Sequence, residues 1–112
     1  MILFAGVAVA DFASARAWYE SFFGRPPDLV PHDNEAAWKI ATDGWVYVVR
    51  DPERAGNGLV TILVDDLDER LAALTSRGIQ SAAVETYSTG VRKVVFTDPE
   101  GNSLALGHVP VG

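Results

Sequence analysis

The stretch Phe4-Ala-Gly-Val-Ala-Val-Ala-Asp11 has a counterpart about 55 residues later, Leu59-Val-Thr-Ile-Leu-Val-Asp65-Asp66. Both stretches are apolar, both suit a β-strand, and both end in aspartate. Each is followed by a segment with the apolar spacing of an amphipathic helix, which ends at Gly24 in the first copy and at Gly78 in the second. An internal repeat of this kind predicts two copies of one supersecondary unit.

Both predicted helices carry recognisable ends. Asp11 or Ser14 can cap the first helix and Asp66 or Asp68 the second, because a short side-chain oxygen accepts a free N–H of the first turn. Glycine at the end of each helix supplies the left-handed stop. The apolar stripes are Ala15, Trp18, Tyr19 and Phe22 in the first helix, and Leu67, Leu71 and Leu74 in the second.

The segments between the helices predict further strands, separated by turn signals. These strands cover Ala36–Ile40, Trp45–Arg50, Val84–Tyr87, Arg92–Thr97 and Ser103–Gly107. Asp98-Pro99-Glu100-Gly101 fits a type I turn, so we assign Asp98, Glu100 and Asn102 to turn formation. The predicted fold class is α+β, as a single domain over residues 1–112, with a first module at 1–55 and a second at 58–112.

Composition excludes several kinds of partner and chemistry. Nine Lys and Arg residues against 15 Asp and Glu residues give a net charge of −6, which repels nucleic acids and anionic membranes. The absence of cysteine excludes disulfides and thiolate-ligated metals. No apolar run approaches the roughly 18 residues of a membrane span, and the apolar N-terminus lacks the basic residues of a signal peptide. We therefore expect a cytoplasmic protein with no nucleic-acid or membrane partner.

These motifs, in this order, resemble the vicinal-oxygen-chelate superfamily of glyoxalase I, extradiol dioxygenases and bleomycin-resistance proteins. The resemblance is carried by Trp18-Tyr19, Phe23-Gly24, Val64-Asp65-Asp66-Leu67, Arg77-Gly78 and the stretch from Phe96 to Leu106. It implies two βαβββ modules whose mixed, mostly antiparallel sheets curl into a cup and are backed by helices. It also implies that the protein is a homodimer.

Metal-using members of this superfamily place their ligands on the cup side of four strands. The matching positions in this chain are Phe4, Leu59, Ala105 and, at the fourth strand, Tyr47 or Val48. None of these is an ordinary ligand for a divalent cation. His32 and His108 lie on separate segments, and the strand period of two turns His108 away from the face of Ala105. We therefore predict no metal and no cofactor.

Strand parity predicts what lines the cup instead. If Phe4 faces the cup, Ile2, Gly6 and Ala8 do too, while Thr61 and Leu63 join Leu59, and Ser103 and Gly107 join Ala105. The predicted ligand-binding residues are Phe4, Trp38, Trp45, Tyr47, Leu59, Thr61, Tyr87, Arg92 and Ala105. Such a lining suits a flat, partly apolar ligand stacked on aromatic rings, although the same aromatic residues also suit a core or a dimer contact.

The sequence is compatible with three functions. The favoured one is a metal-free protein that binds an aromatic or amphipathic small molecule or drug, as bleomycin-resistance proteins do. The alternative is a glyoxalase- or dioxygenase-like enzyme, either with an atypical metal site built from His32, His108 and acidic residues or with Glu35 or Glu85 as a base. The third is a scaffolding dimer whose cup is filled by its own side chains. We predict no catalytic residue for the favoured function.

Overall fold

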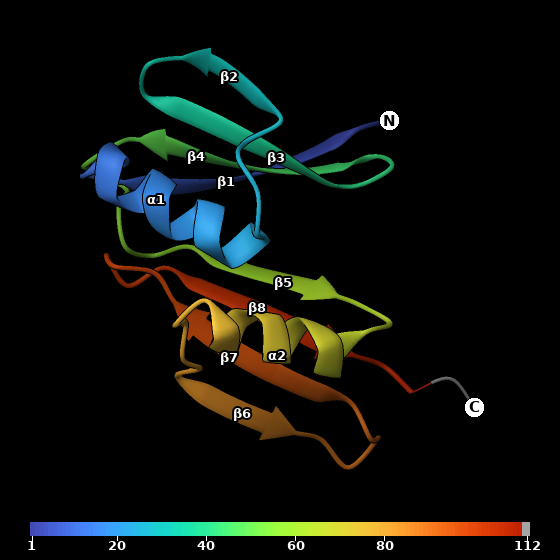
Figure 1. Cartoon of the computed structure of the whole chain (residues 1–112). Coiled ribbons are helices and arrows are strands. Elements are labelled where there is room, and N and C mark those ends of the chain that lie inside the picture. The colour runs from blue at the N-terminus through green and yellow to red at the C-terminus, as the bar shows by residue number, and fades with distance from the viewer. Residues whose placement is uncertain (111–112) are drawn as a thin grey trace.

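The computed structural model describes residues 1–110, which form two modules of the same topology (Figure 1). The first module contains β1 (Leu3–Val9), α1 (Phe12–Phe23), β2 (Leu29–His32), β3 (Glu35–Ala41) and β4 (Gly44–Arg50). The second contains β5 (Leu59–Leu63), α2 (Leu67–Ser76), β6 (Ala83–Thr86), β7 (Arg92–Thr97) and β8 (Ser103–His108). The predicted α+β fold of two βαβββ modules is confirmed.

Each module has a four-stranded mixed sheet. The strand orders are β1-β4-β3-β2 and β5-β8-β7-β6, so the first strand of each module pairs with its last. That pairing is parallel, and the remaining pairings are antiparallel. The crossover through a helix explains the parallel pair, because a parallel neighbour needs a long connection.

The sequence did not predict strand β2. The predicted strands begin only at Ala36, because Pro31 and the nearby Pro26 and Pro27 are typical of a loop. β2 lies at the edge of its sheet, where a residue without an N–H donor such as Pro31 is tolerated. His32 ends this strand and lies opposite Glu35 of β3.

Helix α1 has the predicted ends. The Asp11 carboxylate accepts from the backbone N–H of Ser14 at 3.2 Å and from the Ser14 hydroxyl at 2.9 Å. These bonds hold the pKa of Asp11 below its usual value, because they favour the charged carboxylate. Gly24 ends the helix with φ of 77°, in the left-handed region that glycine adopts without strain.

Helix α2 differs at its N-terminus from what the sequence predicts. Asp66 occupies the N-cap position but makes no side-chain cap hydrogen bond. Its carboxylate accepts from Arg70 Nε at 2.6 Å instead, and this bond lowers the pKa of Asp66. Leu67 and Leu74 are buried as predicted.

The helix-facing sides of both sheets share one hydrophobic core. Helix α1 lies between the sheets in Figure 1, and its Phe22 ring packs edge-on against Phe96 of β7 at a centroid distance of 5.6 Å. Tyr19, Trp38 and Leu104 are completely buried in this core. No helix within residues 1–110 is long and apolar enough to cross a membrane.

A buried polar network joins the modules beside this core. Tyr19 of α1 donates to the Asp98 carboxylate at 2.8 Å, and Asn102 donates to the same carboxylate at 2.8 Å. Asn102 also donates to the Ala8 carbonyl at 3.0 Å and accepts from the Gly58 N–H at 2.7 Å. Asp98 and Asn102 form the predicted turn, and they also connect the two modules and the linker between them.

Candidate functional site

The first sheet has an open side, opposite α1, that carries three aromatic rings. Register and burial place alternate residues of β1, β3 and β4 on this side. We call it the aromatic face, and it consists of Phe4, Gly6, Ala8, Glu35, Ala37, Lys39, Trp45, Tyr47 and Val49. Phe4 and Trp45 stack with nearly parallel rings, at a centroid distance of 5.3 Å and an interplanar angle of 10°.

Tyr47 lies beside this stack. Its ring centroid is 6.4 Å from that of Phe4, and its side chain extends over Gly6 of the neighbouring strand. Val48, the other residue that the sequence allowed at this position, is buried on the helix side. The structure therefore puts Tyr47, not Val48, on the open side.

The second sheet has an equivalent open side with aliphatic and small residues. We call it the aliphatic face, and its β5 and β8 residues are Leu59, Thr61, Leu63, Ser103, Ala105 and Gly107. Leu59 is 86% exposed and Leu63 61% exposed, although both are large and apolar. The predicted parity of both sheets is confirmed by these registers.

The two open faces point away from the core that their sheets share. They therefore do not enclose a common cavity within one chain. Leu59, Thr61 and Ala105 lie on one of these faces, and Phe4, Trp45 and Tyr47 on the other.

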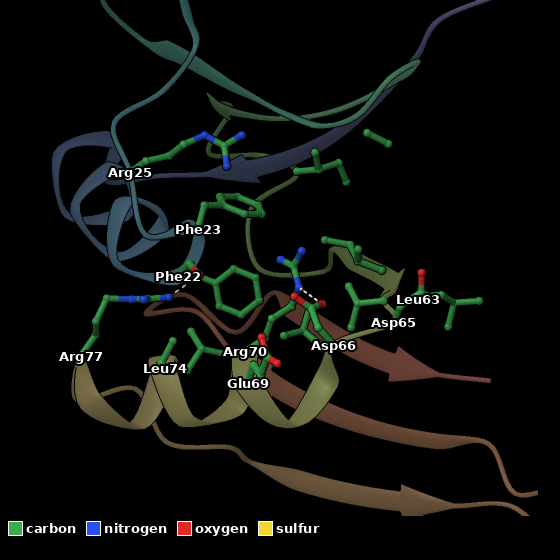
Figure 2. Close-up of a pocket in the computed structure, with 16 residues that line it drawn as sticks. Phe22, Phe23, Arg25, Leu63, Asp65, Asp66, Glu69, Arg70, Leu74 and Arg77 are labelled. Carbon is green, nitrogen blue, oxygen red and sulfur yellow. Dashed lines mark hydrogen bonds and ion pairs between the residues drawn. The ribbon is translucent and has the colours of Figure 1, made fainter. Parts of the chain in front are cut away.

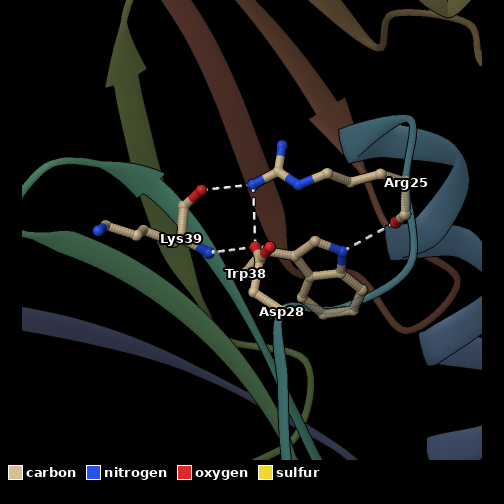
Figure 3. Close-up of polar contacts among 4 residues, drawn as sticks. All are labelled: Arg25, Asp28, Trp38 and Lys39. Carbon is tan, nitrogen blue, oxygen red and sulfur yellow. Dashed lines mark hydrogen bonds and ion pairs between the residues drawn. The ribbon is translucent and has the colours of Figure 1, made fainter.

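Trp38 does not lie on either face, which corrects its prediction as a ligand-binding residue. It is completely buried, and its ring packs against Phe23 at 5.3 Å. The indole N–H donates to the Arg25 carbonyl at 3.0 Å, beside an Asp28 carboxylate that accepts from the Lys39 N–H and from the Arg25 guanidinium (Figure 3). These bonds lower the pKa of Asp28. Trp38 orders the strand and the segment before it, and has no free surface for a ligand.

Arg92 is the second predicted site residue that lies elsewhere. It is directly opposite His108 in the register, on the helix side of its sheet, and its guanidinium contacts Asp68 of α2 at 2.5 Å. Tyr87 lies half exposed in the hairpin between β6 and β7, where its N–H donates to the Val91 carbonyl, beside Arg92 and in the other module from Phe4, Trp45 and Tyr47.

Within residues 1–110, the ionisable residues considered for an atypical metal site do not gather in one cluster. Glu35 lies 3.6 Å from His32 in the first module, and Glu85 lies 3.7 Å from Lys93 in the second. His108 faces the helix side, where its Nδ1 is 2.9 Å from the Val64 carbonyl. No group of three or more His, Asp or Glu side chains within residues 1–110 is placed to hold a metal ion. At the positions that correspond to metal ligands in the superfamily, Phe4, Leu59 and Ala105 carry no metal-ligating atom, and Tyr47 offers a phenol, which is not an ordinary ligand for a divalent cation.

A cleft of about 810 Å³ opens on the helix side, between the end of α1 and the length of α2 from Asp66 to Arg77 (Figure 2). Phe22, Phe23 and Leu74 line its apolar part, and charged residues surround it. The guanidiniums at this cleft already have internal partners. Arg77 donates to the Ser21 and Phe22 carbonyls and so joins the two modules at the end of α1. Arg70 donates to Asp66 at the start of its own helix, α2.

The comparisons with known proteins agree on the fold. The model of the glyoxalase-like domain family matches residues 4–107. The crystal structure of a glyoxalase / bleomycin resistance protein from Catenulispora acidiphila is 46% identical, with a TM-score of 0.94, and the match covers 98% of this chain and 99% of that one. No curated protein matches the chain.

Two more distant structures share only the fold. Lactoylglutathione lyase from Agrobacterium tumefaciens is 20% identical, with a TM-score of 0.78 over 96% of this chain and 92% of that one. A bleomycin-binding protein in complex with bleomycin is 20% identical, with a TM-score of 0.77 over 98% of this chain and 99% of that one.

Proposed function

Because the chain belongs to the glyoxalase-like domain family, we propose that it binds a flat, aromatic or amphipathic small molecule on its aromatic face, without a metal. One observation carries this proposal. Phe4, Trp45 and Tyr47 form a cluster of rings on the open side of a sheet, and Phe4 remains 46% exposed. Aromatic rings that are both clustered and accessible offer a stacking surface for a planar ligand.

The shapes of the two faces support a homodimer that completes the site. On the aromatic face the large residues Trp45 and Tyr47 stand on the inner strand β4. On the aliphatic face the inner strand β8 carries only small residues, and Leu59 and Leu63 stand beside them on β5. The protruding Trp45 and Tyr47 of one copy can therefore pack over the small residues of β8 in a second copy. This packing would cover the exposed Leu59 and Leu63.

Tryptophan fluorescence tests the binding proposal directly. Trp45 is the tryptophan on the aromatic face, whereas Trp18 lies on α1 and Trp38 is buried in the core. We expect bleomycin or 2-naphthol to quench the fluorescence saturably, and we expect Trp45→Phe to remove most of this change. Trp18→Phe is the matched control and should keep it. Quenching that survives in Trp45→Phe and disappears in Trp18→Phe would contradict the proposed site.

The dimer has a separate test. Leu63→Glu places a charge in the proposed contact, whereas Glu53→Gln changes an exposed residue in the linker. Sedimentation should give a dimer for the parent and for Glu53→Gln, and a monomer for Leu63→Glu. A monomeric parent would exclude the proposed assembly, and it would leave ligand binding to be judged by fluorescence alone.

A further inference from the structure

We infer that the Tyr47 hydroxyl is a specificity-determining group that hydrogen-bonds the polar substituent of an aromatic ligand, and that Gly6 is the positioning residue that places it. This inference rests on the proposed function, because it assumes that the ligand lies on the aromatic face. It goes beyond that function by naming the side-chain group that makes the protein bind one aromatic ligand more tightly than another.

The geometry shows that Tyr47 occupies the space above Gly6. A Cβ atom added to Gly6 would lie 2.4 Å from the Tyr47 Cζ and 2.6 Å from its hydroxyl oxygen. Side chains do not pack at such distances, so the ring can hold this position only while residue 6 lacks a side chain. The two residues are direct neighbours in the β1–β4 register.

The backbone does not require glycine at this position. Five glycines of the described residues have positive φ, and Gly6 is not one of them. It lies in the middle of a regular strand, where glycine is less favourable than a residue with a side chain. The absence of a Cβ therefore serves the placement of Tyr47, and not the course of the chain.

The second module has the opposite arrangement at the equivalent place. There the edge strand carries the larger residue, Thr61, and the inner strand carries the small one, Ala105. The two modules therefore share their topology, but the second has no counterpart of the Gly6–Tyr47 pair. Within residues 1–110, this arrangement is found on the aromatic face alone.

The Tyr47 hydroxyl is available for a ligand. Its residue is half-buried among Phe4 and its neighbours, and the hydroxyl makes no hydrogen bond to another residue within 1–110. A phenolic hydroxyl both donates and accepts. The aromatic face therefore offers one polar group beside a stack of rings. This combination favours a flat aromatic molecule that carries a hydroxyl, carbonyl or carboxylate over the bare hydrocarbon.

Two variants separate the presence of the hydroxyl from its position. Tyr47→Phe removes the hydroxyl and keeps the ring, whereas Gly6→Ala keeps both but forces them to move. The matched control is Gly44→Ala, because Gly44 also lies in this sheet with ordinary φ and its added Cβ would meet only the Ala41 Cβ, at an ordinary 3.4 Å. The probes are 2-naphthol and naphthalene, which differ by one hydroxyl, and calorimetric titration gives both dissociation constants.

The measured quantity is the ratio of the naphthalene to the 2-naphthol dissociation constant. We expect this ratio to fall about fivefold in Tyr47→Phe, the loss of one net hydrogen bond, and by a similar factor in Gly6→Ala. Gly44→Ala should keep the parent ratio. Adding Gly6→Ala to Tyr47→Phe should change the ratio no further, since the hydroxyl is already absent.

The possible failures are distinguishable. If the parent binds 2-naphthol and its ratio is unchanged in both Tyr47→Phe and Gly6→Ala, this inference is wrong and the binding proposal stands. If the parent binds neither these probes nor bleomycin, the proposed function fails and this inference fails with it. A ratio that falls in Tyr47→Phe but not in Gly6→Ala would overturn the role assigned to Gly6.

Discussion

The two modules share one topology but hold their helices in different ways. Helix α1 has its own cap at Asp11, and it also receives charges from the second module at both ends. The Glu100 carboxylate accepts from the Ala10 and Asp11 N–H groups at 2.6 and 2.8 Å, and Arg77 donates to the Ser21 and Phe22 carbonyls at 2.5 and 3.2 Å. A carboxylate at the N-terminus and a guanidinium at the C-terminus are the charges that a helix dipole favours.

Helix α2 receives no such support from the first module. Its N-cap makes no side-chain hydrogen bond, and no side-chain hydrogen bond from residues 1–50 reaches either of its ends. Two modules with the same topology can therefore differ in the contacts that stabilise their helices. The ends of α1 therefore receive polar contacts from the second module, whereas the ends of α2 receive none from the side chains of residues 1–50. The predictions below test this asymmetry.

The largest effect is expected at Asn102. Asn102→Ala removes the acceptor of the Gly58 N–H and a donor to the Ala8 carbonyl, and it leaves the buried Asp98 carboxylate with one donor fewer beside Tyr19. We expect the free energy of unfolding to fall by about 3–4 kcal/mol. Urea denaturation measures this, and Asn57→Ala, which changes an exposed asparagine of the linker, should stay within about 0.5 kcal/mol of the parent. Equal losses in both variants would show that the network does not join the modules.

The contacts at the ends of α1 should matter next. Arg77→Met and Glu100→Gln should each lower the free energy of unfolding by about 1–2 kcal/mol, because each weakens charge-assisted bonds to a helix end. Arg54→Met is the control, since Arg54 is 83% exposed and its nearest carboxylate contact is 3.5 Å. Hydrogen exchange should become faster in α1 and stay unchanged in α2. Faster exchange in α2 alone would contradict the asymmetry.

Tyr19 gives the junction a pH dependence. Burial, and then the nearby Asp98 carboxylate, raise the pKa of the Tyr19 phenol well above its ordinary value of 10.0. The folded state therefore keeps a proton that the unfolded state loses above this value, so stability is fully present below pH 10 and declines above it. The slope from this group approaches about 1.4 kcal/mol per pH unit. Denaturation at pH 9 and 11 should show a smaller decline in Tyr19→Phe, and an identical decline would contradict the assignment.

The smallest effect compares the two N-caps. Asp11→Ala removes two hydrogen bonds to Ser14 and should lower the melting temperature by about 4 °C. Asp66→Ala removes only an exposed ion pair with Arg70 and should lower it by less than about 2 °C. Calorimetry would distinguish the two. A larger shift for Asp66→Ala would mean that the second helix is the better anchored of the two.

The sequence predicts those parts of the fold and site that depend on local signals. The repeated strand ending in aspartate, the glycine stops and the strand parity of Phe4 and Tyr47 are readable because each involves neighbouring residues. Strand β2 was missed because an edge strand tolerates a proline such as Pro31, a residue type that usually indicates a loop.

The remaining features depend on partners that are far apart in the sequence. Trp38 and Arg92 were assigned to the site by residue type, whereas their faces are fixed by pairing with Val46 and His108. A type I turn is a sufficient reason for the residues Asp98, Glu100 and Asn102 in the sequence. Nothing in the sequence therefore indicated that Glu100 and Asn102 also contact residues about ninety positions earlier. The space that Gly6 leaves for Tyr47 also appears only once the two strands are in register.

The contacts at the ends of α1 also have a consequence for the order of synthesis. The first module is complete when Arg50 leaves the ribosome, yet Arg77 and Glu100 have still to leave it. Glu100 lies 88 residues after Phe12, so all of these residues must be made before the Glu100 carboxylate can reach the N-terminus of the helix. A chain that stops before residue 100 would lack no residue of the first module, and would still leave that module less stable than in the chain of 112 residues.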